Sequence, residues 1–346
     1  MNKITITAPD DWHLHFRDGE MLLETVPATA RCFKRAIVMP NLMPPVTNAR
    51  EALSYRQRIL AARPKDSDFN PLMTLYLTNE TTPELIKEAH SAEIPAAKLY
   101  PAGATTNSDA AVQGIEKLYP VFEAMSEAGM LLLVHGEVTE DHVDIFDREK
   151  RFIDQHLAPI HARFPDLKIV FEHISTADAG DFVLETSYSM GATITPQHLL
   201  LNRNDLLVGG IKPHNYCLPV LKRNTHQKRL CEIVASGSNK FFLGTDSAPH
   251  EKHTKENACG CAGCYSAWGA IELYAQIFDK LDALDKLEGF ASHHGPDFYG
   301  LARNSGTITL QRSEWAMPND IDLANGEKIV PFYAGHILNW KLTEQS

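Results

Sequence analysis

The feature that most constrains the fold is a regular alternation of short apolar runs with helical patterns. Stretches of helical periodicity, such as 49–62, 82–92, 115–128 and 178–189, lie between runs rich in β-branched and other apolar residues. The eight runs are 3–15, 36–41, 71–78, 96–100, 130–136, 168–174, 192–196 and 240–245. Strands that alternate with helices form a parallel sheet, and eight of them close a (β/α)₈ TIM barrel.

An open, doubly wound sheet is the alternative arrangement of the same elements. No glycine-rich phosphate loop follows the first run, which argues against that alternative. The first run is long enough to be two strands, so the number of barrel strands depends on how it divides. We predict the α/β class, with a single (β/α)₈ barrel domain over residues 1–346 and a C-terminal extension over about 312–346.

Charge, hydropathy and cysteine content exclude several classes of function. The formal net charge of −11 argues against nucleic acid or an anionic membrane as a partner. The longest plain apolar run is about five residues, against about 18 for a membrane span. The N-terminus lacks the apolar core of a signal peptide. Six cysteines predict reduced thiols in a cytoplasmic protein, and we interpret Cys259, Cys261 and Cys264 as thiols in a loop rather than half a zinc site.

Side chains that can bind a metal ion stand at the ends of the apolar runs. His13 and His15 are one residue apart, and side chains two positions apart on a strand share a face. Such a pair alone is more often structural. His135, His173 and Asp246 each close a further apolar run. Because the carboxyl ends of barrel strands carry the active site, these five residues together predict a metal centre.

Lys98 lies inside the apolar run 96–100, where a barrel strand would bury it. An isolated buried ammonium is costly, and its pKa falls until the amine is neutral. The side chain could instead point outward or pair with a carboxylate. A neutral amine can also add CO₂ to form a carbamate, whose two oxygens can bridge metal ions about 3.5–4 Å apart.

These residues, in this order, resemble the amidohydrolase superfamily with a binuclear metal centre. Within it, the chain is similar to the dihydroorotase family of the shorter bacterial and yeast type. The motifs that carry this resemblance are DDWHLHFRDG at 10–19, MPNLMPP at 39–45, KPH at 212–214, LPVLK at 218–222, GTDSAPH at 244–250 and GPDFYG at 295–300. The likeness covers nearly the whole chain.

The resemblance implies that two metal ions share six protein ligands. The more buried ion would be bound by His13, His15 and Asp246, the other by His135 and His173, with carboxylated Lys98 as the bridge. Two Zn²⁺ ions per chain are expected, and ligands of this kind also accept Co²⁺ or Mn²⁺.

The resemblance also implies a substrate and a reaction. The family catalyses the reversible cyclisation of N-carbamoyl-L-aspartate to L-dihydroorotate in de novo pyrimidine biosynthesis. A metal-bound hydroxide would attack the ring amide, with Asp246 as the acid and base. Arg17, Asn41 and His250 would hold the substrate carboxylate, and the backbone of Leu218 and Ala262 would address the ring amide groups. A guanidinium fork suits a carboxylate better than an ammonium does.

The loop 101–108, which carries Thr105 and Thr106, follows the Lys98 run. It could be a plain surface connection, but the resemblance favours a lid that closes over the substrate. The resemblance further implies a homodimer.

Two alternatives stay open: a cyclic amidase of the hydantoinase or allantoinase type, and a catalytically inert barrel scaffold. The residues expected to bind a carboxylate favour the dihydroorotase interpretation over the cyclic amidase. An inert scaffold would be expected to have lost metal ligands.

Overall fold

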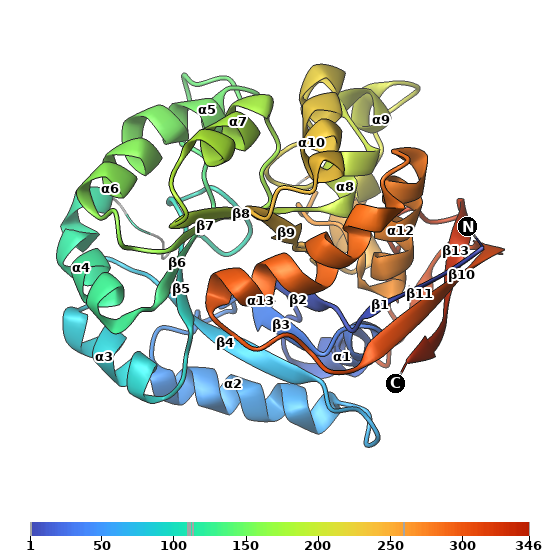
Figure 1. Ribbon diagram of the computed structural model, residues 1–346, viewed down its shortest axis with the longest axis horizontal. Coiled ribbons are helices and arrows are strands. Elements are labelled where there is room, and N and C mark those ends of the chain that lie inside the picture. Colours follow the sequence, from blue (N-terminus) through green and yellow to red (C-terminus); the bar gives the residue numbers. More distant parts are fainter. Residues whose placement is uncertain (1, 109–111, 113, 259, 346) are drawn as a thin grey trace.

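The computed structural model describes residues 2–108, 112, 114–258 and 260–345. Eight parallel strands form one sheet, in which each strand lies beside the next one in the sequence. They are β2 (Asp10–Leu14), β3 (Arg35–Val38), β4 (Asn70–Tyr76), β5 (Ala96–Leu99), β6 (Leu131–Val134), β7 (Ile169–Phe171), β8 (Met190–Ile194) and β9 (Phe241–Leu243). Helices surround the strands (Figure 1).

The sheet curls until its first and last strands meet. Leu14 and Ser247 form a parallel bridge just beyond β9. The N–H of His15 donates to the carbonyl of Ser247 at 2.9 Å, and the N–H of Asp246 donates to the carbonyl of His13 at 2.8 Å. The predicted TIM barrel is therefore confirmed, and its seam joins two segments that carry predicted metal ligands.

The helices follow the strands as the periodicity predicts. Asn48 caps α2 by accepting from the N–H of Glu51, and Thr82 caps α3 ahead of Pro83. The α-helices are α1 (Leu22–Ala30), α2 (Ala49–Ala62), α3 (Pro83–Ser91), α4 (Tyr119–Ala128), α5 (Arg148–Phe152), α6 (Ala158–Arg163), α7 (Ala177–Glu185), α8 (Pro196–Leu200), α9 (Arg203–Leu207), α10 (Asn224–Ser236), α11 (Lys252–Lys255), α12 (Ala270–Lys280) and α13 (His294–Tyr299). Shorter 3₁₀ or π segments are η1 (Gly19–Met21), η2 (Ile115–Leu118), η3 (Ile153–Leu157), η4 (Pro213–Asn215), η5 (Ala267–Gly269), η6 (Leu284–Lys286) and η7 (Gly289–His293). None of the described helices is long and apolar enough to cross a membrane.

The first apolar run divides into two strands. β1 (Lys3–Thr7) leaves the barrel and pairs antiparallel with β10 (Thr307–Ala316), which pairs in turn with β13 (Ile337–Gln345). A small hairpin of β11 (Ile321–Asp322) and β12 (Lys328–Ile329) lies between β10 and β13 in the sequence. The two ends of the chain thus share one sheet on the same side of the molecule (Figure 1). This pairing supports our proposal that residues 1–346 form one domain.

The barrel interior separates an apolar floor from a polar mouth. Trp12, Leu133 and Phe242 belong to an inner cluster of buried side chains, and the ring of Trp12 stacks on Tyr299 with centroids 4.3 Å apart. Ala96 belongs to the same cluster. Lys98 lies two residues farther along β5, so it shares this inward face rather than pointing outward.

Candidate metal centre

The six predicted metal ligands come together at the carboxyl ends of the barrel strands. They lie within, or at most three residues after, β2, β5, β6, β7 and β9, and the side chain of each is buried. The ring of His173 lies between two others, with centroids 4.8 Å from those of both His13 and His135. The centroids of His13 and His15 are 5.4 Å apart. Residues from five strands, far apart in the sequence, therefore face one small volume.

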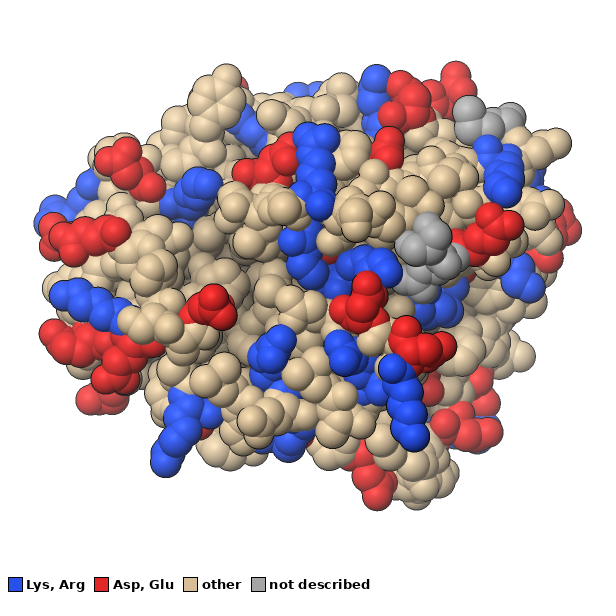
Figure 2. Space-filling view, turned by 60° about the horizontal axis from the view of Figure 1, so that its bottom comes forward, with Lys and Arg blue, Asp and Glu red and all other residues tan. Residues whose placement is uncertain are grey.

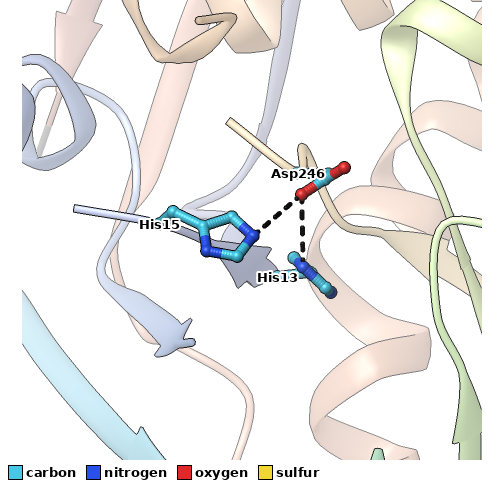
Figure 3. A group of neighbouring side chains, drawn as sticks. All are labelled: His13, His15 and Asp246. Carbon is cyan, nitrogen blue, oxygen red and sulfur yellow. Dashed lines mark hydrogen bonds and ion pairs between the residues drawn. The ribbon is translucent and has the colours of Figure 1, made fainter. Parts of the chain in front are cut away.

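His13, His15 and Asp246 form the first candidate site (Figure 3). One atom from each lies within 4.8 Å of the other two. Oδ1 of Asp246 lies 3.3 Å from Nε2 of His13 and 3.1 Å from Nε2 of His15. These are the three residues that the family resemblance assigns to the more buried ion.

A second group contains a residue that the sequence analysis missed. His13, Glu172 and His173 also offer atoms within 4.8 Å of one another. Oε1 of Glu172 lies 3.0 Å from Nδ1 of His13, and Oε2 contacts Nζ of Lys98. Lys98 thus pairs with a carboxylate, which was one of the expected alternatives. Burial lowers the pKa of Lys98, although the charge of Glu172 opposes that shift.

The backbone of two predicted ligands departs from the strand conformation. His173 and Asp246 have φ values of 41° and 45°, in the left-handed region that non-glycine residues rarely adopt. His173 lies two residues after the end of β7, and Asp246 lies three residues after the end of β9. Simple strand alternation would place Glu172 and His173 on opposite faces, but here both reach the same group. This turn explains why Glu172 could not be assigned from spacing alone.

Two of the histidines have their second ring nitrogen fixed by a neighbouring side chain. Nδ1 of His15 lies 2.8 Å from Oδ1 of Asn41, and Nε2 of His135 lies 2.9 Å from Oε2 of Glu137. Such partners orient a metal-binding imidazole and leave its other nitrogen for the ion. Glu137 was also missed, although it follows His135 at the same two-residue spacing that joins His13 and His15.

The electrostatics of the group suit metal ligands. Burial lowers the pKa of His15 to about 4 and that of His173 well below its ordinary value, so both imidazoles are neutral. Burial alone would raise the pKa of Asp246, but the adjacent imidazoles of His13 and His15 hold it well below its ordinary value. Among the described residues, neither ring nitrogen of His13 makes a well-aligned hydrogen bond, and Nδ1 of His173 is also unpartnered. These buried nitrogens are available to cations, which fits a metal centre.

The predicted substrate residues lie beside this group. Nη2 of Arg17 is 3.0 Å from Nε2 of His250, which is 3.0 Å from the carbonyl of Ala262. Nη1 of Arg17 is buried and has no hydrogen-bond partner among the described residues. The amide oxygen of Asn41 contacts His15, so Asn41 touches a predicted metal ligand and also lines a cleft together with Arg17. For Leu218, the described contacts include no hydrogen bond of its N–H or carbonyl.

The loop 101–108 lies against these residues. Oγ1 of Thr106 donates to the carbonyl of Ala262 at 3.4 Å, and Nδ2 of Asn41 donates to the carbonyl of Thr106 at 3.1 Å. The N–H of Thr105 donates to Oγ of Ser108 at 3.1 Å within the loop. The adjoining cleft, of about 580 Å³, is lined by Arg17, Asn41 and Asn107 among others. The predicted lid therefore touches the candidate substrate residues.

The cysteine cluster is only partly described. Cys259 lies outside the described residues. Cys32, Cys217, Cys231, Cys261 and Cys264 are free thiols.

Comparison with known proteins identifies relatives that agree with one another in family and fold. The model of the amidohydrolase family matches residues 6–313. A dihydroorotase from Pseudoalteromonas atlantica is 70% identical over 342 residues, which cover 99% of both chains. The crystal structure of a dihydroorotase from Saccharomyces cerevisiae, in complex with 5-fluoroorotic acid, is 33% identical with a TM-score of 0.92 and covers 99% of both chains. A dihydroorotase structure from Campylobacter jejuni is 38% identical with a TM-score of 0.90, covering 99% of this chain and 98% of that one.

Proposed function

The chain belongs to the amidohydrolase family, and from this membership we propose that it acts as a dihydroorotase, as its full-length relatives do. It catalyses the reversible cyclisation of N-carbamoyl-L-aspartate to L-dihydroorotate, a step of de novo pyrimidine biosynthesis. The structural observation that carries the proposal is the buried Nη1 of Arg17, which has no hydrogen-bond partner in the described part of the chain and lies near the histidine and aspartate group. A carboxylate on the substrate would satisfy this donor.

The predicted ligand residues fit divalent metal ions, because neutral imidazoles and carboxylates bind Zn²⁺ and also accept Co²⁺ or Mn²⁺. One ion would be held by His13, His15 and Asp246 and the other by His135 and His173, with carboxylated Lys98 between them. Bound ions would lower the pKa of a water molecule to about 7 and polarise a carbonyl oxygen. The identity of the ions as Zn²⁺, the carbamate, a homodimer and a cytoplasmic location stay predictions of the family resemblance.

The predicted catalytic and substrate-binding residues have these roles in the reaction. Asp246 accepts the proton of the attacking water and delivers it to the ring nitrogen that leaves. In the cyclising direction it accepts the proton of the ureido nitrogen. Arg17, together with Asn41 and His250, holds the substrate carboxylate, which fixes the ring relative to Asp246. The backbone groups of Leu218 and Ala262 orient the ring amides.

The competing interpretation is a hydantoinase or allantoinase type of cyclic amidase. Such an enzyme would share the metal ligands but would have no use for a guanidinium placed to bind a carboxylate. An inert scaffold is disfavoured because a residue able to bind a metal ion is present at all six predicted ligand positions and their side chains converge.

The test compares L-dihydroorotate with rings that lack the carboxylate, namely dihydrouracil and hydantoin. We expect hydrolysis of dihydroorotate only, and Arg17→Met should lower kcat/KM roughly 10–100-fold because a hydrogen bond to a charged group is worth about 1.5–3 kcal/mol. Metal content should be unchanged in that variant. Equal turnover of hydantoin and dihydroorotate would contradict the proposal and favour the competing amidase.

A further inference from the structure

A buried ion pair lies directly behind His135. Glu137 and Lys222 are 2% and 3% exposed, and Oε1 of Glu137 is 3.6 Å from Nζ of Lys222. The other carboxylate oxygen, Oε2, is 2.9 Å from Nε2 of His135. Charged side chains are rarely buried to this extent unless they are paired, and a buried pair is costly to desolvate. Neither residue is part of the ligand or substrate set described above.

The first consequence concerns the ring of His135. Because Glu137 engages Nε2, only Nδ1 is free to face an ion, and the ring cannot rotate without losing this contact. A carboxylate that accepts from the far nitrogen of an imidazole fixes both its orientation and the position of its proton. Glu137 therefore determines how His135 is presented to the metal centre.

The second consequence concerns the loop that carries Leu218. Nζ of Lys222 donates to the carbonyl of Val220 at 3.1 Å. The preceding carbonyl, that of Pro219, lies 2.9 Å from Nε2 of the buried His198. Two buried side chains thus hold two successive carbonyls of the loop. The backbone of Leu218, just ahead of them, is left for the substrate ring.

We propose that Glu137 and Lys222 are a positioning pair that couples the second metal position to the loop that recognises the substrate ring. Glu137 orients His135 from one side, and Lys222 holds both the carboxylate of Glu137 and the loop carbonyl from the other. Neither residue touches the reacting atoms. The inference rests on the proposed function, because it takes His135 as a ligand and Leu218 as a ring contact.

The test uses the metal-loaded enzyme and separates the two halves of the pair. Glu137→Gln keeps the shape of the side chain but weakens the hydrogen bond that it accepts from His135. The affinity for one of the two Zn²⁺ ions should therefore fall roughly 10–100-fold. Chelator competition with Zn²⁺ measures this without any turnover. Lys222→Met should instead raise KM for L-dihydroorotate, with a smaller change in Zn²⁺ affinity. Because the residues act together, Glu137→Gln/Lys222→Met should cost less than the two single changes combined.

The double variant also covers the case in which a single variant fails to fold, since it removes both charges of the pair rather than one. Glu272→Gln is the matched control: Glu272, on α12, is buried and paired at 2.7 Å with Arg31, the residue after α1, and its described side-chain hydrogen bonds are with Arg31 and Leu342. It should lower thermal stability but leave Zn²⁺ affinity and KM unchanged. Wild-type Zn²⁺ affinities in Glu137→Gln and in the double variant would overturn the positioning role. Wild-type enzyme that neither binds two ions nor turns over dihydroorotate would instead overturn the proposed function, and this inference with it.

Discussion

At the scale of single residues, the site is built from groups that a folded chain normally avoids. Lys98 is fully buried, and Arg17, His173 and Asp246 have positive φ values of 63°, 41° and 45°. Backbone in this region costs of order 1–3 kcal/mol per residue and persists where the surrounding structure enforces it, often at functional sites. These three residues include two proposed ligands and the proposed carboxylate clamp. The conformational cost thus falls on residues whose side chains converge.

The first prediction concerns Lys98. We expect Lys98→Ala to abolish turnover of dihydroorotate and to lower the metal content, because the proposed bridge between the ions is lost. In the wild-type enzyme, ¹³C NMR after exchange with labelled bicarbonate should show a carbamate signal that Lys98→Ala lacks. A variant with two bound ions and full activity would contradict the bridge. It would leave Lys98 as a structural partner of Glu172.

The second prediction concerns His198 and pH. Burial lowers the pKa of His198 to about 4, whereas an unfolded histidine titrates near 6.5. At a pH between these two pKa values, His198 binds a proton in the unfolded chain but not in the folded protein. The free energy of unfolding should therefore fall as the pH drops from about 6.5 to 4, by roughly 3 kcal/mol from this residue. Urea unfolding of His198→Gln should show a correspondingly shallower pH dependence, and identical slopes in both proteins would refute this.

At the scale of elements, local signals predicted most of the barrel. The helix expected at 49–62 is observed as Ala49–Ala62, because Asn48 caps its start. The expected strand at 3–15 divides at Pro9, which lacks the N–H that a continuous ladder needs. Its first half pairs with β10, some 300 residues away, and no local pattern predicts such a partner.

The site was predicted less completely than the barrel. Ligands at strand ends follow from the position of each polar residue after an apolar run. Glu172 and Glu137 were missed because their roles depend on which neighbours the folded backbone brings near them. The contacts of Asn41 with both His15 and Thr106 likewise join three separate segments.

The third prediction concerns the loop 101–108 as a unit. Thr105→Val/Thr106→Val keeps the β-branched shape but removes both hydroxyl donors. If the loop closes over the substrate, kcat should fall roughly 10²–10³-fold, the usual cost of losing a donor to the transition state. Metal content and thermal stability should barely change. Thr186→Val, directly after the C-terminal end of the outer helix α7, is the matched control and should keep wild-type kcat. A double variant with near wild-type kcat would make the loop a plain connection.

At the scale of the whole molecule, an acidic protein contains a site suited to an anion. The net charge is −11, yet the cleft beside the site is lined by three arginines, Arg17, Arg50 and Arg58, against two carboxylates, Asp18 and Glu51. Acidic and basic side chains are interspersed over the face shown in Figure 2. We propose that this local arrangement of charge, rather than the net charge, governs which substrate is attracted.

The most direct test of this account measures turnover and metal content on the same sample of purified protein. We predict hydrolysis of L-dihydroorotate and cyclisation of N-carbamoyl-L-aspartate, with activity that rises with bound metal to a maximum at two ions per chain. Chelation should abolish both directions, and re-addition of Zn²⁺ should restore them. Full turnover by metal-free protein, or no turnover with two ions bound, would contradict the central claim.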